Sequence, residues 1–290
     1  MKRFTLKATE RRRARRSENY WHKSKMIQFH VYPGGKKRIV TFSYDDGPAC
    51  DKRLVDLFNK YKVKGTFHLN GGEASEEKIA ELRNRYQGHE ISCHTVAHGW
   101  LNRMPYQSMV QEIMNNRLYL EKITGQPVVG MSYPCSSYAY NETVKEAAKL
   151  CGIVYSRTTK STMTFHLPDD FLEWHPSCHH KDAPGLSDKF VETIDSAWVG
   201  HLFYIWGHAH EFRTEEDWKV MEGILEKIAG NDKVWYATNM EIYQYMTAQK
   251  SLLITADEKC IYNPTAITVW VEKDMKEIIC VPAGEMVYID

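Results

Sequence analysis

From residue 37 onward the chain alternates between short apolar runs and amphipathic patterns. Seven runs rich in β-branched and aromatic residues predict strands over 38–44, 64–69, 89–93, 128–133, 153–157, 201–206 and 233–236. Apolar residues that recur every three or four positions predict helices over 51–61, 76–86, 106–124, 142–150, 187–199, 215–229 and 240–250. This alternation predicts an α/β fold with a mostly parallel sheet, and about seven units favour a distorted or incomplete (β/α)7-8 barrel.

The residues after 250 have a different pattern. Two β-rich runs, 268–271 and 278–281, flank a Lys-Asp turn at 273–274, and a Pro-Ala-Gly turn then precedes a last short strand. We therefore expect a basic N-terminal arm (1–26), a barrel (27–250) and a small C-terminal β-hairpin extension (251–290). An isolated hairpin is marginal in water, so it must pack on the barrel or on another subunit, and we favour a homo-oligomer contact.

Composition excludes some partners. Of the 290 residues, 43% are hydrophobic and 26% are charged, which is enough for a full core. Lys plus Arg (38) nearly balances Asp plus Glu (37), so no overall field favours nucleic acid, and none is expected as a partner. The basic run at 11–16 could bind an anionic polymer, but a solvated arm is the favoured interpretation.

The same survey bears on location. No apolar stretch approaches the roughly 18 residues of a membrane span. The basic start is not followed by the apolar segment of an export signal, so we expect a cytoplasmic protein. The seven cysteines are widely spaced and form no C-x-x-C pair, which indicates reduced thiols.

Two adjacent carboxylates, Asp45 and Asp46, follow the first predicted strand in the stretch SYDDGP. Ordinary turn chemistry, with Gly47 and Pro48 next, is one interpretation. The other is that a rigid strand end assigns the two acids different tasks, one in metal binding and one in proton transfer. A barrel places its chemistry at the carboxyl ends of its strands, which is where these residues lie.

A pair of histidines follows the third predicted strand. His94 and His98 in HTVAH are four residues apart, which would place both rings on one face of a helical turn. Such pairs also arise by chance, but a carboxylate at an equivalent strand end strengthens the case for a metal. Two histidines and one aspartate leave coordination positions open, as a catalytic Zn²⁺ or similar ion requires.

These two motifs carry a resemblance to a known family. SYDDGP is similar to the TFDDGP of the polysaccharide deacetylases (NodB-like, carbohydrate esterase family 4), and HTVAH matches their H-[ST]-x-x-H. The order and interval also match, and the resemblance extends over about 37–250. It implies that Asp45 is the general base and that Asp46, His94 and His98 hold a divalent metal, with Zn²⁺ preferred and Co²⁺ or Ni²⁺ as alternatives.

The later family motifs match less well. In the third, R-x-x-P-[YF], Pro134 is present and the arginine is missing, while Cys135 would offer its backbone N–H to the oxyanion. The Asp-Trp signature finds only Glu173-Trp174, where Trp174 is either a wall of a sugar pocket or a core residue. Arg157, at the end of the fifth predicted strand, could replace the missing arginine by orienting Asp45; a surface arginine is the alternative.

The resemblance also implies a histidine that acts as general acid after an apolar strand. In LFYIWGHAH, His208 is preferred to His210, because Gly207 opens the backbone before it and His210 would point elsewhere if the strand persists. A further group of histidines could hold a second ion or substrate. Because no carboxylate lies at a fixed spacing from them, we favour the interpretation that they line the pocket or lie on the surface. They are His175, His179 and His180.

The function that the resemblance implies is a metal-dependent hydrolase that removes acetyl groups from an N-acetylated carbohydrate, by amide or ester cleavage. The alternatives are an amidohydrolase of the same fold family acting on a small non-sugar amide, an inactive carbohydrate-binding relative, and a non-haem iron oxygenase with the same two-His-one-carboxylate set. A cytoplasmic location favours soluble oligosaccharides, nucleotide sugars or small amides as substrates.

Overall fold

The computed structural model describes residues 27–196 and 201–289, so the predicted arm over 1–26 lies outside the described residues. The described chain divides into two compact units. One comprises residues 32–247, and the other combines 27–31 with 248–289. This division differs from the expected boundaries because the strand at Ile27–Gln28 pairs with the C-terminal residues Glu272 and Lys273.

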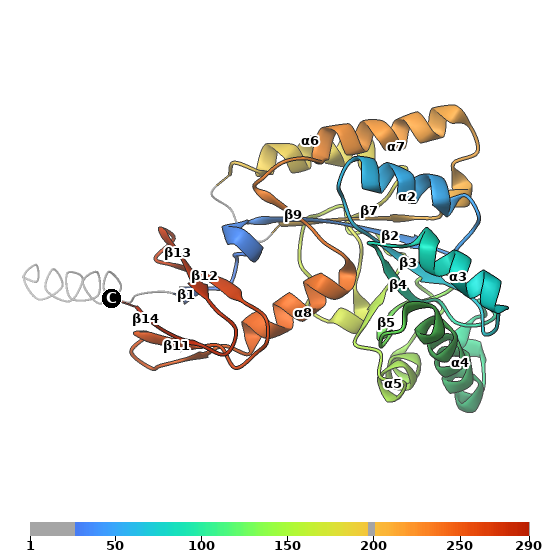
Figure 1. Ribbon diagram of the computed structural model, residues 1–290, viewed down its shortest axis with the longest axis horizontal. Coiled ribbons are helices and arrows are strands. Elements are labelled where there is room, and N and C mark those ends of the chain that lie inside the picture. Colours follow the sequence, from blue (N-terminus) through green and yellow to red (C-terminus); the bar gives the residue numbers. More distant parts are fainter. Residues whose placement is uncertain (1–26, 197–200, 290) are drawn as a thin grey trace, which may run out of the picture. The chain divides into compact units, whose positions relative to one another are not determined.

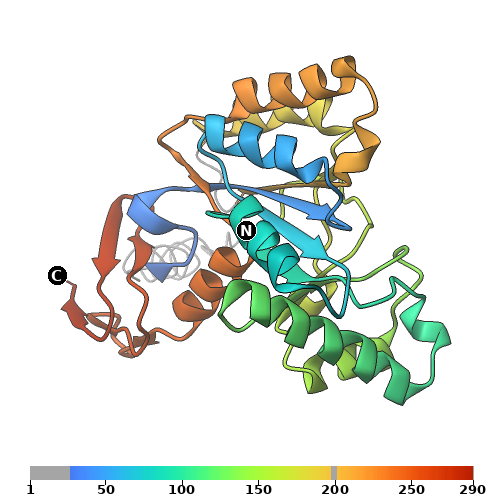
Figure 2. The same ribbon diagram turned by 45° about the vertical axis from the view of Figure 1, so that its right-hand side comes forward.

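The larger unit is built on one parallel sheet of eight strands, ordered β6-β5-β4-β3-β2-β8-β7, with β9 also paired to β2. Its strands are β2 (Arg38–Asp45), β3 (Gly65–Leu69), β4 (Glu90–Cys93), β5 (Gly130–Ser132), β6 (Tyr155–Arg157), β7 (Cys178–His179), β8 (His201–Gly207) and β9 (Val234–Tyr236). Figure 2 shows β2 and β3, in blue and cyan, running the same way. The predicted class, an α/β incomplete (β/α) barrel, is confirmed.

The helices that cover this sheet are α2 (Asp51–Lys60), α3 (Glu76–Arg85), α4 (Tyr106–Thr124), α5 (Glu142–Leu150), α6 (Ala183–Thr193), α7 (Glu215–Ile228) and α8 (Asn239–Lys250). In Figure 1, α2, α6 and α7 lie together on one side of the sheet, and α4 lies beside α5. Caps explain several bounds, because Ser75 and Asn141 accept hydrogen bonds from backbone N–H groups in the first turns of α3 and α5. Gly125 ends α4 with φ 68°.

One predicted helix differs from the structure, and one strand has no counterpart in the prediction. The helix expected over 187–199 begins earlier, because Pro184 occupies a first-turn position where its missing N–H needs no partner. It ends at Thr193, and residues 194–196 form a turn and a bend. Strand β7 has two residues only, too few for an apolar period to be visible in the sequence.

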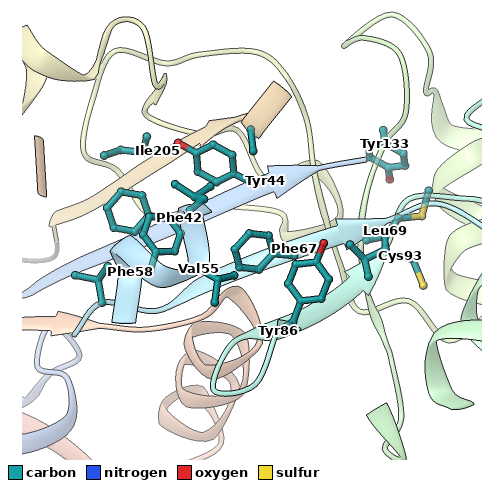
Figure 3. Packing of buried hydrophobic residues seen from close by; sticks show 14 of the residues in the cluster. Phe42, Tyr44, Val55, Phe58, Phe67, Leu69, Tyr86, Cys93, Tyr133 and Ile205 are labelled. Carbon is teal, nitrogen blue, oxygen red and sulfur yellow. The ribbon is translucent and has the colours of Figure 1, made fainter. Parts of the chain in front are cut away.

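Strand β2 lies at the centre of the core. All eight of its residues are buried. Aromatic rings from β2, β3 and α2 pack together in Figure 3, and the ring centroids of Phe42 and Phe58 are 4.7 Å apart. Burial of each such side chain stabilises the fold by roughly 1.5–3 kcal/mol. The end of β2, where Asp45 lies, is therefore held on a rigid element.

The smaller unit contains two three-stranded sheets, β1-β12-β13 and β10-β11-β14. Their strands are β1 (Ile27–Gln28), β10 (Leu253–Ile254), β11 (Cys260–Tyr262), β12 (Val269–Lys273), β13 (Glu277–Val281) and β14 (Met286–Tyr288). The predicted hairpin is present as β12 and β13, whereas the last strand pairs with β11. Gln249 Nε2 donates to the backbone oxygens of Val31 and Trp270, both at 3.0 Å. The expected homo-oligomer contact stays a prediction.

Two further expectations concern the whole described chain. No helix among residues 27–196 and 201–289 is both long enough and apolar enough to cross a membrane. All seven cysteines are free thiols, as predicted.

Candidate active site

The two carboxylates after β2 have different environments. Asp45 is the last residue of the strand and is 1% exposed. Asp46 has φ 75°, so the chain turns there, and its backbone N–H donates to His68 O at 3.0 Å. Gly47 follows with φ 63°, and a Cβ atom at this glycine would lie 2.8 Å from the Leu69 side chain. The turn therefore leaves one acid buried and the other 29% exposed at its side chain.

His94 and His98 lie in the loop after β4 and not on a helical turn, which corrects the sequence interpretation. His98 has φ 53°, and Thr95, with φ 65°, accepts a hydrogen bond from His98 N–H at its Oγ1. Asn116 of α4 accepts the N–H of His94 at 2.9 Å. Specific side-chain hydrogen bonds, and not a helical period, bring the two rings together.

Asp46, His94 and His98 nevertheless converge as predicted. Asp46 Oδ1 lies 3.5 Å from His94 Nε2 and 3.6 Å from His98 Nε2. Ligand atoms about 2.0–2.1 Å from a tetrahedral ion lie roughly 3.3–3.4 Å apart, so the spacing fits one divalent ion.

The hydrogen bonds of His94 also fit a metal ligand. Its Nδ1 lies 3.0 Å from the backbone oxygen of Ser132 and 2.7 Å from Ser132 Oγ, which places the ring proton on Nδ1. Nε2 is buried and has no hydrogen-bond partner among the described residues. Burial lowers the pKa of His94, so the ring is neutral and keeps a lone pair on Nε2.

Asp45 is bound by an arginine from the other side of the barrel. Arg157 Nη2 donates to Asp45 Oδ2, and Ser132 Oγ donates to Oδ1 at 3.1 Å. The guanidinium also donates to Ser43 Oγ at 3.1 Å and lies 4.5 Å from the ring centroid of Trp206. Burial by itself would raise the pKa of Asp45, but the Arg157 guanidinium holds the pKa below its usual range.

The contact predicted between Arg157 and Asp45 is therefore present. Met131 stands at the position of the missing motif arginine and is fully buried. On the adjacent strand Arg157 pairs in register with Ser132, which brings its side chain to the same edge of the sheet. That Arg157 orients the base stays a proposal.

Cys135 lies at the rim of the metal-ligand group. Its φ is 70°, and its backbone N–H points to His98 Nε2 at 3.5 Å. The thiol donates to His98 O at 3.4 Å. The N–H after Pro134 thus faces the ligand group, a position from which it can donate to a developing oxyanion.

Both candidate general acids, His208 and His210, lie near Asp46. His208 Nε2 and His210 Nδ1 each lie 4.0 Å from Asp46 Oδ2. His210 was expected to point elsewhere only if the strand persisted, and this condition is not met, because β8 ends at Gly207 and residues Ala209–Glu211 form a 3-10 turn. His208 is distinguished by a bond from its Nδ1 to Glu211 Oε1 at 3.2 Å.

Trp174 is a core residue, which corrects its assignment to a sugar pocket. Its side chain is 0% exposed and packs edge-on against Tyr155, Phe171 and Tyr204. Its backbone pairs with that of Arg157. Trp174 therefore supports the strand that carries Arg157.

Replacing Trp174 with alanine is expected to lower the free energy of unfolding by about 3–5 kcal/mol, the usual loss for a large buried aromatic side chain. Chemical denaturation measures this change. A variant of unchanged stability that bound carbohydrate more weakly would instead restore the pocket interpretation.

Three side chains of the site were not predicted: Ser132, Trp206 and Glu211. Ser132 and Trp206 lie within predicted strands, where an alternating period was the only available signal. The motif His-Ala-His-Glu at 208–211 contained Glu211, but only the 3-10 turn brings its carboxylate back to His208. His175 lies apart from the other histidines of its group, with Nδ1 2.7 Å from Thr158 Oγ1.

Comparisons with known proteins find matches among the polysaccharide deacetylases. The family model described as polysaccharide deacetylase matches residues 33–156. The peptidoglycan-N-acetylglucosamine deacetylase of Bacillus cereus is 25% identical over 118 residues, which is 40% of this chain and 54% of that protein. Chitin deacetylase 2 of Cryptococcus neoformans is 23% identical over 164 residues, 54% of this chain and 32% of that protein. The chain thus spans about half or less of these relatives' own lengths.

Solved structures show the same fold. A protein of Mycobacterium smegmatis assigned to the polysaccharide deacetylases superposes with a TM-score of 0.58 at 17% identity, covering 78% of this chain and 96% of that one. The Xyl-CE4 domain of a multidomain xylanase from the hindgut metagenome of Trinervitermes trinervoides has a TM-score of 0.51 at 18% identity, covering 73% and 92%. The fold is that of the carbohydrate esterase barrels. The resemblance to the polysaccharide deacetylases (NodB-like, carbohydrate esterase family 4) that the sequence motifs carry is thus confirmed, and the family model covers residues 33–156.

Proposed function

We propose that the protein is a metal-dependent hydrolase that removes acetyl groups from an N-acetylated carbohydrate. The observation that carries the proposal is the convergence of Asp46, His94 and His98 beside a second, separately held carboxylate, Asp45. A binding protein would need neither a base nor a buried cation to keep that base ionised. The names of the relatives, which are peptidoglycan, chitin and chitooligosaccharide deacetylases, support carbohydrate as the substrate class.

The metal ligands and the base have separate roles in this proposal. Asp46, His94 and His98 would hold a divalent ion, which supplies a Lewis acid for the acetyl carbonyl and a bound water of lowered pKa. Asp45 accepts the proton of the attacking water. Arg157 keeps Asp45 ionised, and Ser132 fixes the direction of its other oxygen.

The remaining groups serve the oxyanion and the leaving group. The backbone N–H of Cys135 donates a hydrogen bond to the oxyanion, a role that its side chain does not affect. His208 gives a proton from Nε2 to the departing nitrogen. Glu211 accepts from Nδ1 of the same ring, which fixes the orientation of Nε2 toward Asp46.

An acetate-release assay tests the function. Metal-stripped protein is reconstituted with Zn²⁺, Co²⁺ or Ni²⁺ and presented with chitooligosaccharides, O-acetylated sugars and small N-acetyl amides. We expect acetate only from reconstituted protein, and fastest from the N-acetylated oligosaccharides. Binding of oligosaccharide without any release of acetate would contradict the proposal in favour of an inactive binding relative.

Replacing His94 with glutamine is expected to reduce zinc at saturation by one equivalent per chain, because this buried ring offers Nε2 to no other described group. Metal analysis of the dialysed protein measures the loss. The matched control is His166→Gln, which changes an exposed histidine and should keep its metal. Full zinc content in the His94 variant would refute the ligand assignment.

A further inference from the structure

A second group of metal-binding side chains lies behind His208. His179, at the end of β7, and His180 point their Nε2 atoms at one carboxylate oxygen of Glu211. The two distances to Glu211 Oε2 are 3.1 and 3.3 Å. The sequence interpretation had set a second ion aside because it found no carboxylate for these histidines, and the fold supplies that carboxylate.

The spacing fits a single ion. The three candidate ligand atoms lie within 4.8 Å of one another, as those of the Asp46 group do. The distances to Glu211 Oε2 are close to the roughly 3.3 Å edge of a tetrahedral site. Two imidazoles and one carboxylate form a donor set suited to zinc, whereas Mg²⁺ prefers oxygen ligands.

The group is also held in place. His180 is 5% exposed, stacks on Phe212 with ring centroids 4.5 Å apart, and lies parallel to Tyr44. A Cβ atom at Gly207 would lie 2.0 Å from His180 Nδ1, so the glycine makes room for the ring.

Two features oppose ion binding and set its strength. Lys181 Nζ lies 3.0 Å from Glu211 Oε2 and provides the positive charge there, but its side chain is 65% exposed and can move into solvent. The backbone N–H of Lys181 donates to His179 Nδ1 at 3.3 Å, so the ring proton is on Nε2. Coordination through Nε2 shifts that proton to Nδ1 and loses this long hydrogen bond.

From this geometry we propose that His179, His180 and Glu211 form a second divalent-cation site of zinc type, in which the ion replaces the Lys181 ammonium. The site shares no ligand with the group of Asp46, His94 and His98. His208 lies between the two groups, 3.2 Å from Glu211 Oε1 and 4.0 Å from Asp46 Oδ2. Glu211 can therefore hold the ion through Oε2 and His208 through Oε1.

Zinc titration of the metal-stripped full chain, followed by calorimetry and metal analysis, tests this site. Wild-type protein should bind two equivalents, and Glu211→Gln and His179→Gln should each bind one. His94→Gln should also bind one equivalent, retained at the second site, and the double variant His94→Gln/Glu211→Gln should bind none. Mg²⁺ should not replace zinc at the second site.

Substitution of Lys181 tests the second site without removing any of its proposed ligands. Lys181→Met should tighten the second zinc by about fivefold, the equivalent of one exposed ion pair. Lys219→Met, at an exposed lysine paired with Glu216, is the control and should change nothing. If wild-type protein bound only one equivalent of zinc and Glu211→Gln still bound it, the proposal would be wrong. His179, His180 and Lys181 would then serve only as hydrogen-bonding partners of Glu211. That result would not affect the acetyl hydrolysis proposed above, which depends on His94.

Discussion

Asp45→Asn is expected to lower turnover by roughly 10² to 10⁴, the usual contribution of a positioned proton-transfer group. The amide has the shape of the carboxylate but cannot accept the proton of the attacking water. Zinc content should stay unchanged, because Asp46 and the two histidines supply the ligand atoms and Asp45 Oδ2 is 3.8 Å from His94 Nε2. Acetate release and metal analysis on the same preparation measure both effects.

The matched control for Asp45 is Asp56→Asn, at an exposed carboxylate on α2 that pairs with Lys52. It should leave turnover and zinc as in the wild type. If zinc instead fell in proportion to activity in the Asp45 variant, the two adjacent acids would share metal binding, and the division of roles between them would be wrong.

Arg157→Met is expected to move the acidic limb of the pH–rate profile to higher pH. Arg157 holds the pKa of Asp45 down against burial, which raises it. Without the cation, burial dominates, the carboxyl is protonated at higher pH, and less base is ionised at a given acidic pH. Breaking this buried pair should also lower the free energy of unfolding by about 3–5 kcal/mol, because it leaves a charge uncompensated.

Arg157→Lys provides the second measurement if the methionine variant does not fold. Lysine keeps the charge but not the planar fork that also donates to Ser43 and Thr158. Its acidic limb should lie between those of the wild type and the methionine variant. Arg53→Met, at an exposed arginine, is the control. If the acidic limb lay at the same pH in the wild type and in all three variants, Arg157 would have no role in the ionisation of Asp45.

The fold could be predicted where local signals are strong. Helices α4 and α5 have the predicted bounds, because Gly125 and Asn141 mark their ends chemically. Helix α6 was misplaced since its periodic apolar face gave no indication of the start at Ala183. Strand β7 is defined by its pairing with β8, a contact between separate parts of the chain.

The residues of the site also fall into those that a local sequence signal marks and those that only the fold brings together. Two short motifs contain Asp45, Asp46, His94 and His98, and the family resemblance that these motifs carry implies the roles proposed for the four residues. Trp174 was ambiguous because a tryptophan next to an acid has the same local sequence in a pocket and in a core. The bond of Glu211 to His179 depends on β7 lying beside β8, an order that no local pattern encodes.

The ion pair between Arg157 and Asp45 connects β6 to β2, and three other strands lie between these two in the sheet. During synthesis the proposed metal ligands are all present once residue 98 has been made, whereas the cation for Asp45 comes 59 residues later, the difference between positions 157 and 98. The segment matched by the family model ends at residue 156, one position before this arginine. A fragment cut at that boundary would contain every proposed zinc ligand of the first site and yet leave its base without a counter-charge.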